Sequence, residues 1–155
     1  MNRFNVRVYG LLFNDEKEVL VTDENRFGIQ FTKFPGGGLE FGEGTIECLK
    51  REFIEELNSE IEIDSHYYTT DFCQESAFKK TDQLLCIYYK VKLVAGLKTE
   101  ISKKKFDFKE QEQIFRWMPI TDLQKEEALT FPIDKIVAKM LIVNFNINQI
   151  GGDGN

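Results

Sequence analysis

Six residues between positions 37 and 56 combine one glycine, one arginine and four glutamates at a spacing that could build a metal site: Gly37, Glu43, Arg51, Glu52, Glu55 and Glu56. Residues three and four apart share one face of a helix, so the last three glutamates should point the same way, within an arc of roughly 100°. Carboxylates this close repel one another unless a cation lies among them, and oxygen ligands suit Mg²⁺, Mn²⁺ or Ca²⁺. A cation held on a helix that follows a glycine loop indicates a phosphate-bearing substrate.

Two local elements must position these side chains, a glycine loop and the helix that follows it. Pro35 and the glycines at 36–38 predict a stop in regular structure. The helix is predicted to begin near Thr45, a good N-cap residue, and to end near Leu57, because Asn58 suits the left-handed position after a helix. Its apolar stripe should pack against a sheet while the glutamates occupy the neighbouring sector: Ile46, Leu49, Phe53 and Leu57.

The rest of the chain predicts six strands and two further helices. Apolar and alternating runs indicate strands over 3–13, 18–22, 26–31, 61–72, 84–94 and 114–118. A capping box at Thr121 should open a short helix, and Pro132 suits the first turn of a last helix that runs to about Phe145. The order β-β-β-α-β-β-β-α predicts a mixed α/β sandwich. We expect one domain over 1–148 and a flexible tail over 149–155.

Composition and charge narrow the classes of function. The chain has 155 residues, a net charge of −6 and a pI near 5.0, which argues against binding of extended nucleic acid and still allows a short phosphate-bearing ligand. Three cysteines without paired spacing, Cys48, Cys73 and Cys86, predict reduced, buried thiols. We expect no signal peptide and no membrane contact, and therefore a cytoplasmic protein. Phe-rich segments permit a homodimer.

The spacing of the six residues resembles the Nudix box, Gly-x5-Glu-x7-Arg-Glu-apolar-x-Glu-Glu-x-Gly-apolar. Phe53 also matches, whereas Asn58 replaces the second glycine and Ser59 replaces the last apolar residue. Asn tolerates the same backbone region as glycine, and Ile61 is expected to replace the missing apolar contact. The segment from Arg116 to Leu123 looks like the closing strand and helix of that family. The resemblance covers most of the chain, but only the box is specific.

The resemblance implies an α/β/α sandwich, with a mixed β-sheet packed between helices, and a hydrolase that acts on acid anhydrides of phosphorus. Its substrate would be a small nucleoside diphosphate linked to another moiety, such as an NDP-sugar, ADP-ribose, a dinucleotide or a (d)NTP, and Mg²⁺ or Mn²⁺ would be required. Glu55 and Glu56 would be the main metal ligands, with Glu52 and the Gly36 carbonyl as further ligands.

The general base differs among Nudix enzymes, so its identity stays open here. It would lie on the box helix, as Glu52 or Glu55, or on a loop near the last strands, where Glu110 and Glu112 are the candidates. Glu43 and Arg51 would form an ion pair that fixes the loop against the helix, with Gly37 in that loop.

Other readings of the same residues also stay open. One is a Nudix-fold module that senses nucleotides without turnover, and another is an RNA-end-processing enzyme, which the acidity of the chain disfavours. Arg7 and Arg26 alternate with apolar residues and are candidates to face the substrate. The basic run over 98–105 is either a solvated loop or a guide for anionic substrates.

Overall fold

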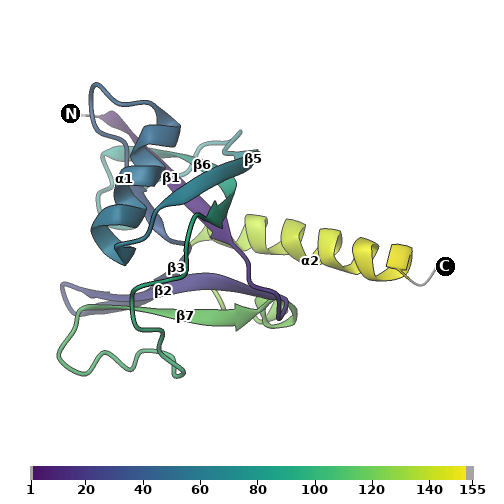
Figure 1. The fold of residues 1–155 in the computed structure, drawn as a ribbon. Helices are drawn as coiled ribbons and strands as arrows, with labels where there is room; N and C mark the ends of the chain where they lie inside the picture. The colour runs from purple at the N-terminus through teal and green to yellow at the C-terminus, as the bar shows by residue number, and fades with distance from the viewer. Residues whose placement is uncertain (1, 153–155) are drawn as a thin grey trace. The chain divides into compact units, whose positions relative to one another are not determined.

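The computed structural model describes residues 2–152, which divide between two compact units (Figure 1). The first unit contains the residues up to 13 and the segment 34–101, and the second contains 14–33 and the segment from 102 onward. Each unit therefore combines two separate stretches of the chain. The mixed α/β class predicted from the sequence is confirmed, with two sheets and two α-helices among the described residues.

The first unit is a four-stranded sheet with one helix. Its strand order is β4-β1-β6-β5, in which β1 and β6 run parallel and the two outer pairs are antiparallel. Parallel strands need a long crossover connection, and here the parallel pair places Arg3 opposite Asp82. The elements are β1 (Arg3–Leu12), β4 (Gly36–Gly38), α1 (Thr45–Leu57), β5 (Ile61–Thr69) and β6 (Asp82–Leu93).

Helix α1 has the predicted bounds but differs in two details. Ile46 is 43% exposed, so its predicted burial is wrong; periodicity does not fix the limits of the buried arc, and Cys48 completes the arc instead. The N-cap is Gly44 rather than Thr45, and the Thr45 hydroxyl forms a hydrogen bond of 2.7 Å with the Tyr89 hydroxyl. The buried face of the helix consists of Cys48, Leu49, Phe53 and Leu57.

The sequence predicted that the glycines at 36–38 would stop regular structure. This prediction is wrong, because these glycines form the short strand β4. They pair antiparallel with β1, and Tyr9 lies opposite Gly36. A side chain on Gly36 would overlap the Val8 carbonyl and Tyr9, and the φ of Gly36 is +144°. Glycine is therefore required because β1 approaches this backbone closely. The strand fixes the start of the loop that leads to α1.

An ion pair joins the parallel strands at the start of the sheet. Arg3 Nε donates to Asp82 Oδ1 at 2.9 Å and Arg3 Nη2 donates to Asp82 Oδ2 at 3.1 Å. The Asp82 side chain is 2% exposed, and its hydrogen bond with Arg3 holds the pKa of the carboxyl below its ordinary value. A depressed carboxyl pKa stabilises the fold above the unfolded-state pKa, about 4, and this contribution is lost as pH falls through the folded-state value.

Replacing Arg3 with Gln should therefore remove part of the acid sensitivity of the protein. We expect the urea midpoints of the wild type and Arg3→Gln to differ at pH 6–7, with the wild type more stable. The difference should shrink as pH falls below about 4 and through the lower folded-state pKa of Asp82, because the carboxyl is then protonated in both the folded and the unfolded state. Urea titrations at several pH values measure this difference, and one that stays constant with pH would contradict the assignment.

The second unit is a three-stranded antiparallel sheet followed by a 3₁₀ turn and a long helix. The strand order is β3-β2-β7. Phe27 and Gly28, with φ of +54° and +77°, form the two-residue turn between β2 and β3, so the predicted third strand begins three residues later than expected. The elements are β2 (Glu18–Arg26), β3 (Ile29–Lys33), β7 (Gln113–Pro119), η1 (Ile120–Gln124) and α2 (Pro132–Gly152).

A buried carboxylate ties the strands of this sheet together. Asp23 has no exposed surface, and it accepts hydrogen bonds from Arg116 Nε at 2.7 Å and Arg116 Nη2 at 3.1 Å. The Thr32 hydroxyl donates to it at 2.7 Å and the Phe106 amide at 3.0 Å. Both carboxylate oxygens are therefore satisfied, which a buried charge requires.

Helix α2 is longer than predicted. It continues from Phe145, its predicted end, to Gly152, because no residue over 144–150 lacks a backbone donor or requires a left-handed conformation. The proposed tail over 149–155 thus begins inside the helix, and its residues 153–155 lie outside the described part of the chain. No helix within 2–152 is long and apolar enough to cross a membrane.

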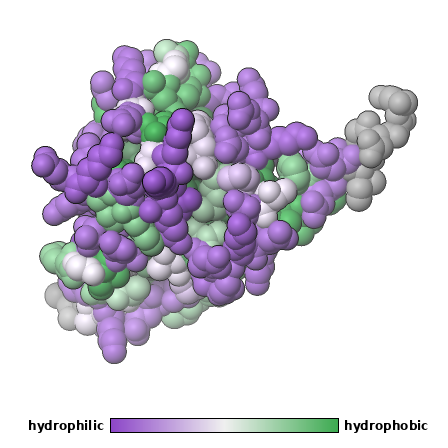
Figure 2. Space-filling model, turned by 90° about the horizontal axis from the view of Figure 1, so that it is seen from below, coloured by the Kyte–Doolittle hydropathy of each residue, from purple (hydrophilic) through white to green (hydrophobic). Residues whose placement is uncertain are grey.

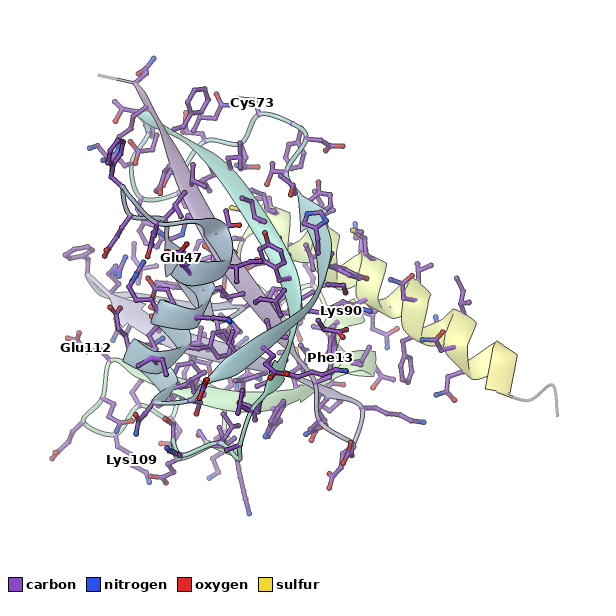
Figure 3. The ribbon with its side chains drawn as sticks, turned by 45° about the horizontal axis from the view of Figure 1, so that its top comes forward. Phe13, Glu47, Cys73, Lys90, Lys109 and Glu112 are labelled. Atoms are coloured by element: carbon purple, nitrogen blue, oxygen red, sulfur yellow. The ribbon has the colours of Figure 1, made fainter. Side chains whose placement is uncertain are left out.

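The cysteines are all free in the described residues, as the sequence predicted. Cys48 and Cys86 are buried, but Cys73 is exposed, so the expectation of three buried thiols is wrong for that residue. Cys73 lies on the segment between β5 and β6 (Figure 3), whereas Cys48 lies on α1 and Cys86 on β6.

Candidate functional site

The predicted site residues of the first unit gather where the β4 loop meets α1. Glu52 lies against the backbone of Gly37, since a Cβ built on that glycine would overlap the Glu52 carboxylate. The side chain of Glu52 is 12% exposed. The absence of a side chain at Gly37 thus creates the space into which the carboxylate fits.

Arg51 connects the loop with the carboxylates of the helix. Its Nε and Nη2 donate to the two oxygens of Glu43 at 3.0 and 2.7 Å, which is the expected ion pair in bidentate form. Its Nη1 donates to Glu52 Oε1 at 3.0 Å and to Glu55 Oε2 at 3.2 Å. Nη2 also donates to the Gly38 carbonyl at 3.1 Å. One guanidinium therefore holds the loop and two glutamates together.

The electrostatics of the site follow from this arrangement. Hydrogen bonds from Arg51 lower the pKa of Glu43 to about 2, so this carboxylate is ionised at neutral pH. The same bonds raise the pKa of Arg51, which stays charged. Burial raises the pKa of the Cys48 thiol to about 12, and the neighbouring Glu43 adds to that shift. Cys48 is therefore a neutral thiol that packs between the loop and the helix.

The donor chemistry of the helix fits a hard divalent cation, although the carboxylates do not form a ready-made metal cluster. Glu52 and Glu55 meet at the same Arg51 nitrogen, and Glu55 is 56% exposed, so its side chain is open to solvent. No group of three or more His, Cys, Asp or Glu side chains within the described residues is arranged to hold a metal ion. Carboxylates and a backbone carbonyl are nevertheless the ligands that Mg²⁺ prefers.

Arg7 lies on the strand next to the loop. It pairs in register with Gly38 across β1 and β4, and its Nε donates to the Tyr9 hydroxyl at 2.6 Å. Electrostatic interaction with Tyr9 raises the pKa of Arg7, and Glu52 adds a smaller contribution. The guanidinium is thus a fixed positive charge close to the predicted carboxylate site.

Three predicted site residues lie outside the first unit. Glu110, Glu112 and Arg26 belong to the second unit. The two glutamates are exposed on the loop before β7, where Figure 3 labels Glu112, and Arg26 is exposed at the end of β2. The basic run over 98–105 spans both units. Lys105 donates to the Glu127 carbonyl at 3.0 Å and lies over the Phe106 ring, so it has structural partners.

The comparisons with known proteins agree with this geometry. A family model described as NUDIX domain matches residues 3–140. The chain belongs to the Nudix family. The resemblance seen in the box is thereby confirmed, and with it the hydrolase class that the family implies. No match was found among curated proteins.

Solved structures of Nudix proteins share the fold at low sequence identity. A MutT protein from Methanosarcina mazei is 17% identical with a TM-score of 0.68, covering 93% of this chain and 96% of its own. The ORF135 protein of E. coli is also 17% identical, with a TM-score of 0.67. The match covers 99% of this chain and 96% of the ORF135 chain. A Nudix hydrolase from Nitrosomonas europaea is 19% identical, with a TM-score of 0.66. The match covers 94% of this chain and 90% of the Nitrosomonas europaea chain.

The two departures from the Nudix box leave the local structure intact. Asn58 has φ +46° and ψ +36°, the left-handed conformation that the box glycine would adopt, and its amide donates to the Ile54 carbonyl. Ser59 is buried, and its hydroxyl donates to the Leu57 carbonyl at 2.8 Å. Ile61 is 1% exposed and supplies the buried apolar side chain after the helix.

Sequence reasoning missed three contributors to the Nudix site. Tyr9 lies two residues after Arg7 on the same strand, so strand alternation could have placed them on one face. Cys48 lies three residues before Arg51, and the Arg51 Nη2–Cys48 Sγ distance is 3.7 Å. The Gly38 carbonyl, which accepts from Arg51, carries no side-chain signal at all.

Replacing Gly37 with Ala should displace Glu52 and lower hydrolysis at least tenfold in kcat/KM, because the new methyl group occupies the position of the carboxylate. Gly44→Ala is the matched control, since its Cβ would meet Glu47 Oε1 at an ordinary 3.5 Å. Steady-state kinetics of both variants and the wild type measure the effect. Similar losses in both variants would contradict a specific role for the Gly37–Glu52 contact.

Proposed function

We propose that this chain is a divalent-metal-dependent pyrophosphohydrolase of a small nucleotide, cleaving a nucleoside diphosphate linked to another moiety. The single observation that carries the proposal is the complete set of box carboxylates, with Glu52 seated against Gly37 and Arg51 joined to Glu43. A module that only senses nucleotides has no need of this set.

In the proposed reaction, a water oxygen attacks one phosphorus of the pyrophosphate, and the bridging P–O bond breaks. The phosphate on the far side leaves with the bond electrons, and the water proton passes to a carboxylate base. For an NDP-sugar or ADP-ribose the products are a nucleoside monophosphate and a phosphorylated sugar. For a nucleoside triphosphate they are a monophosphate and pyrophosphate.

The residues of the first unit would have separate roles in this reaction. Glu55, Glu56, Glu52 and the Gly36 carbonyl would hold Mg²⁺ or Mn²⁺, which when bound neutralises phosphate charge and acidifies a water molecule. Arg51 keeps the loop and Glu52 in place through its bonds to Glu43 and the Gly38 carbonyl. Arg7 lies beside Gly38, and its hydrogen bond to Tyr9 holds the guanidinium in place. This charged group would contact a substrate phosphate.

Four carboxylates are candidates for the general base. Glu52 and Glu55 lie on α1, and Glu110 and Glu112 lie on the loop before β7. Arg26, on β2, is a second candidate for binding the anionic substrate. We place the reaction in the cytoplasm, since free cysteines suit a reducing compartment.

A substrate panel with product identification tests the proposal. NDP-sugars, ADP-ribose, dinucleotides and (d)NTPs are incubated with the protein and Mg²⁺ or Mn²⁺, and products are separated by ion-exchange chromatography. Reaction in ¹⁸O-labelled water then shows which phosphorus is attacked, since one product carries the label. Binding of nucleotides by calorimetry without any product would overturn the proposal in favour of a sensing module.

A further inference from the structure

Helix α2 carries two apolar stripes, and only one of them is covered by its own unit. Ile133, Val137 and Leu141 are at most 5% exposed and recur every four residues. Phe145 extends this stripe and lies under Lys17, whose Nζ is 5.8 Å from the ring centroid. These residues form the side of the helix that packs into the second unit.

The other stripe, which we call the seam, consists of Ile136, Met140, Val143 and Ile147. Its spacing of four, three and four residues is the a/d pattern by which one helix packs against another in a coiled coil. Ile136 and Met140 are partly exposed, whereas Val143 and Ile147 are 55% and 60% exposed. Figure 2 shows apolar surface exposed along this helix between polar side chains. The seam is thus most exposed where the helix runs toward its C-terminal end.

The residues along this part of α2 do not favour a helix by themselves. Between Met140 and Gln149 the chain has three asparagines and three β-branched residues, all weak helix formers. Short helices are marginal in water unless an apolar face is packed against a neighbour. The helix nevertheless continues to Gly152. Packing on the seam would supply the missing stabilisation.

The same segment contains no charged residue. Asp, Glu, Lys and Arg are absent from 140–149, although the chain has a net charge of −6. Two copies of an acidic protein repel each other over most of their surface, and this uncharged stretch is a place where they can meet without like-charge contacts. A partner recognised by charge, or an anionic membrane surface, would require Lys or Arg on this face.

We propose that the seam of α2 binds the seam of a second copy of the same chain, giving a symmetric dimer. Ile136, Met140, Val143 and Ile147 of each copy form its apolar contact, and Asn144 and Asn146 flank it as uncharged polar residues. The seam spans about 16 Å along the helix. This is short for a coiled coil, so the dimer is weak and its population depends on protein concentration.

Sedimentation velocity of the full chain over about 5 μM to 1 mM tests the proposal. The weight-average mass of the wild type should rise from 18.1 kDa toward twice that value. The double variant Val143→Asp/Ile147→Asp should raise the dissociation constant at least about a hundredfold, because it places charges in the apolar contact. Both positions are exposed, so the monomer should keep its fold, as circular dichroism and urea unfolding can verify.

The double variant Asn148→Asp/Gln149→Glu is the matched control. It adds the same two charges to the same exposed helix outside the seam, and it should dimerise within about threefold of the wild type. A wild type that stays monomeric at 1 mM would overturn the proposal. Equal dimerisation of the seam variant would overturn it as well. So would a chain that remains monomeric and instead sediments with phosphatidylcholine vesicles.

Discussion

Replacing Glu55 or Glu56 with Gln should reduce kcat/KM by roughly 10²–10⁴-fold, which corresponds to about 3–5 kcal/mol of transition-state stabilisation. Each change removes a negative charge while preserving the size of the side chain. The proposed function assigns both carboxylates to the divalent cation. Hydrolysis of the best substrate at saturating Mg²⁺ gives the kinetic effect, and the paramagnetic resonance signal of free Mn²⁺ gives the loss of metal affinity.

The matched control for these variants is Glu47→Gln. Glu47 lies in the first turn of the same helix (Figure 3), is exposed, and has no place in the box spacing. It should retain activity within about twofold of the wild type. If Glu47→Gln lost as much activity as the other variants, a general effect of helix charge would explain the data better. Full activity in Glu55→Gln and Glu56→Gln would remove the carboxylate set from the mechanism.

Replacing Arg116 with Met should destabilise the protein by about 3–5 kcal/mol, because the carboxylate of Asp23 would remain buried without its counterion. Asp23 is completely buried, and Arg116 is only 12% exposed. Such a loss is a large part of the stability of a domain of this size. Urea unfolding followed by circular dichroism measures it, and Arg26→Met, at an exposed position, should change stability by less than about 0.5 kcal/mol.

A second substitution separates the effect of charge from that of packing. In Asp23→Asn/Arg116→Met both charges are gone. The amide oxygen of Asn can still accept from the Phe106 amide, and its amide nitrogen can donate to the Thr32 hydroxyl. This double variant should be more stable than Arg116→Met alone. If it is less stable, the loss in the single variant comes from the packing of the Arg116 side chain rather than from an unpaired charge.

Elements with strong periodicity were predicted well, and those set by contacts between segments were not. The bounds of α1 followed from its apolar spacing and from Asn58, which adopts the left-handed conformation that was expected. The burial of Ile46 was predicted wrongly, because helical periodicity leaves the edge of the buried arc open. Strand β4 was missed since three glycines have little strand propensity, and only pairing with β1 makes them a strand.

The turn between β2 and β3 was also not predicted from the sequence. Both Phe27 and Gly28 were placed inside a strand, because Phe is rare in the left-handed region that it adopts here. In the site, the pairing of Arg51 with Glu43 could be predicted from the family resemblance. Its bond to Glu55 is an i,i+4 contact within α1, which helix spacing allows. Its bond to the Gly38 carbonyl depends on the approach of the loop to the helix, which no spacing rule describes.

The alternation of chain segments between the two units affects how the protein is made. Strand β2 (Glu18–Arg26) pairs with β7. Its sheet can therefore be completed only after almost a hundred further residues have left the ribosome. Strand β1 likewise can pair with β6 only after the residues between them have been synthesised. Such distant pairings slow folding and leave unpaired edges exposed in the nascent chain. Truncation at any point before Pro119 would therefore release a polypeptide with unfinished sheets, a natural target for chaperones and proteases.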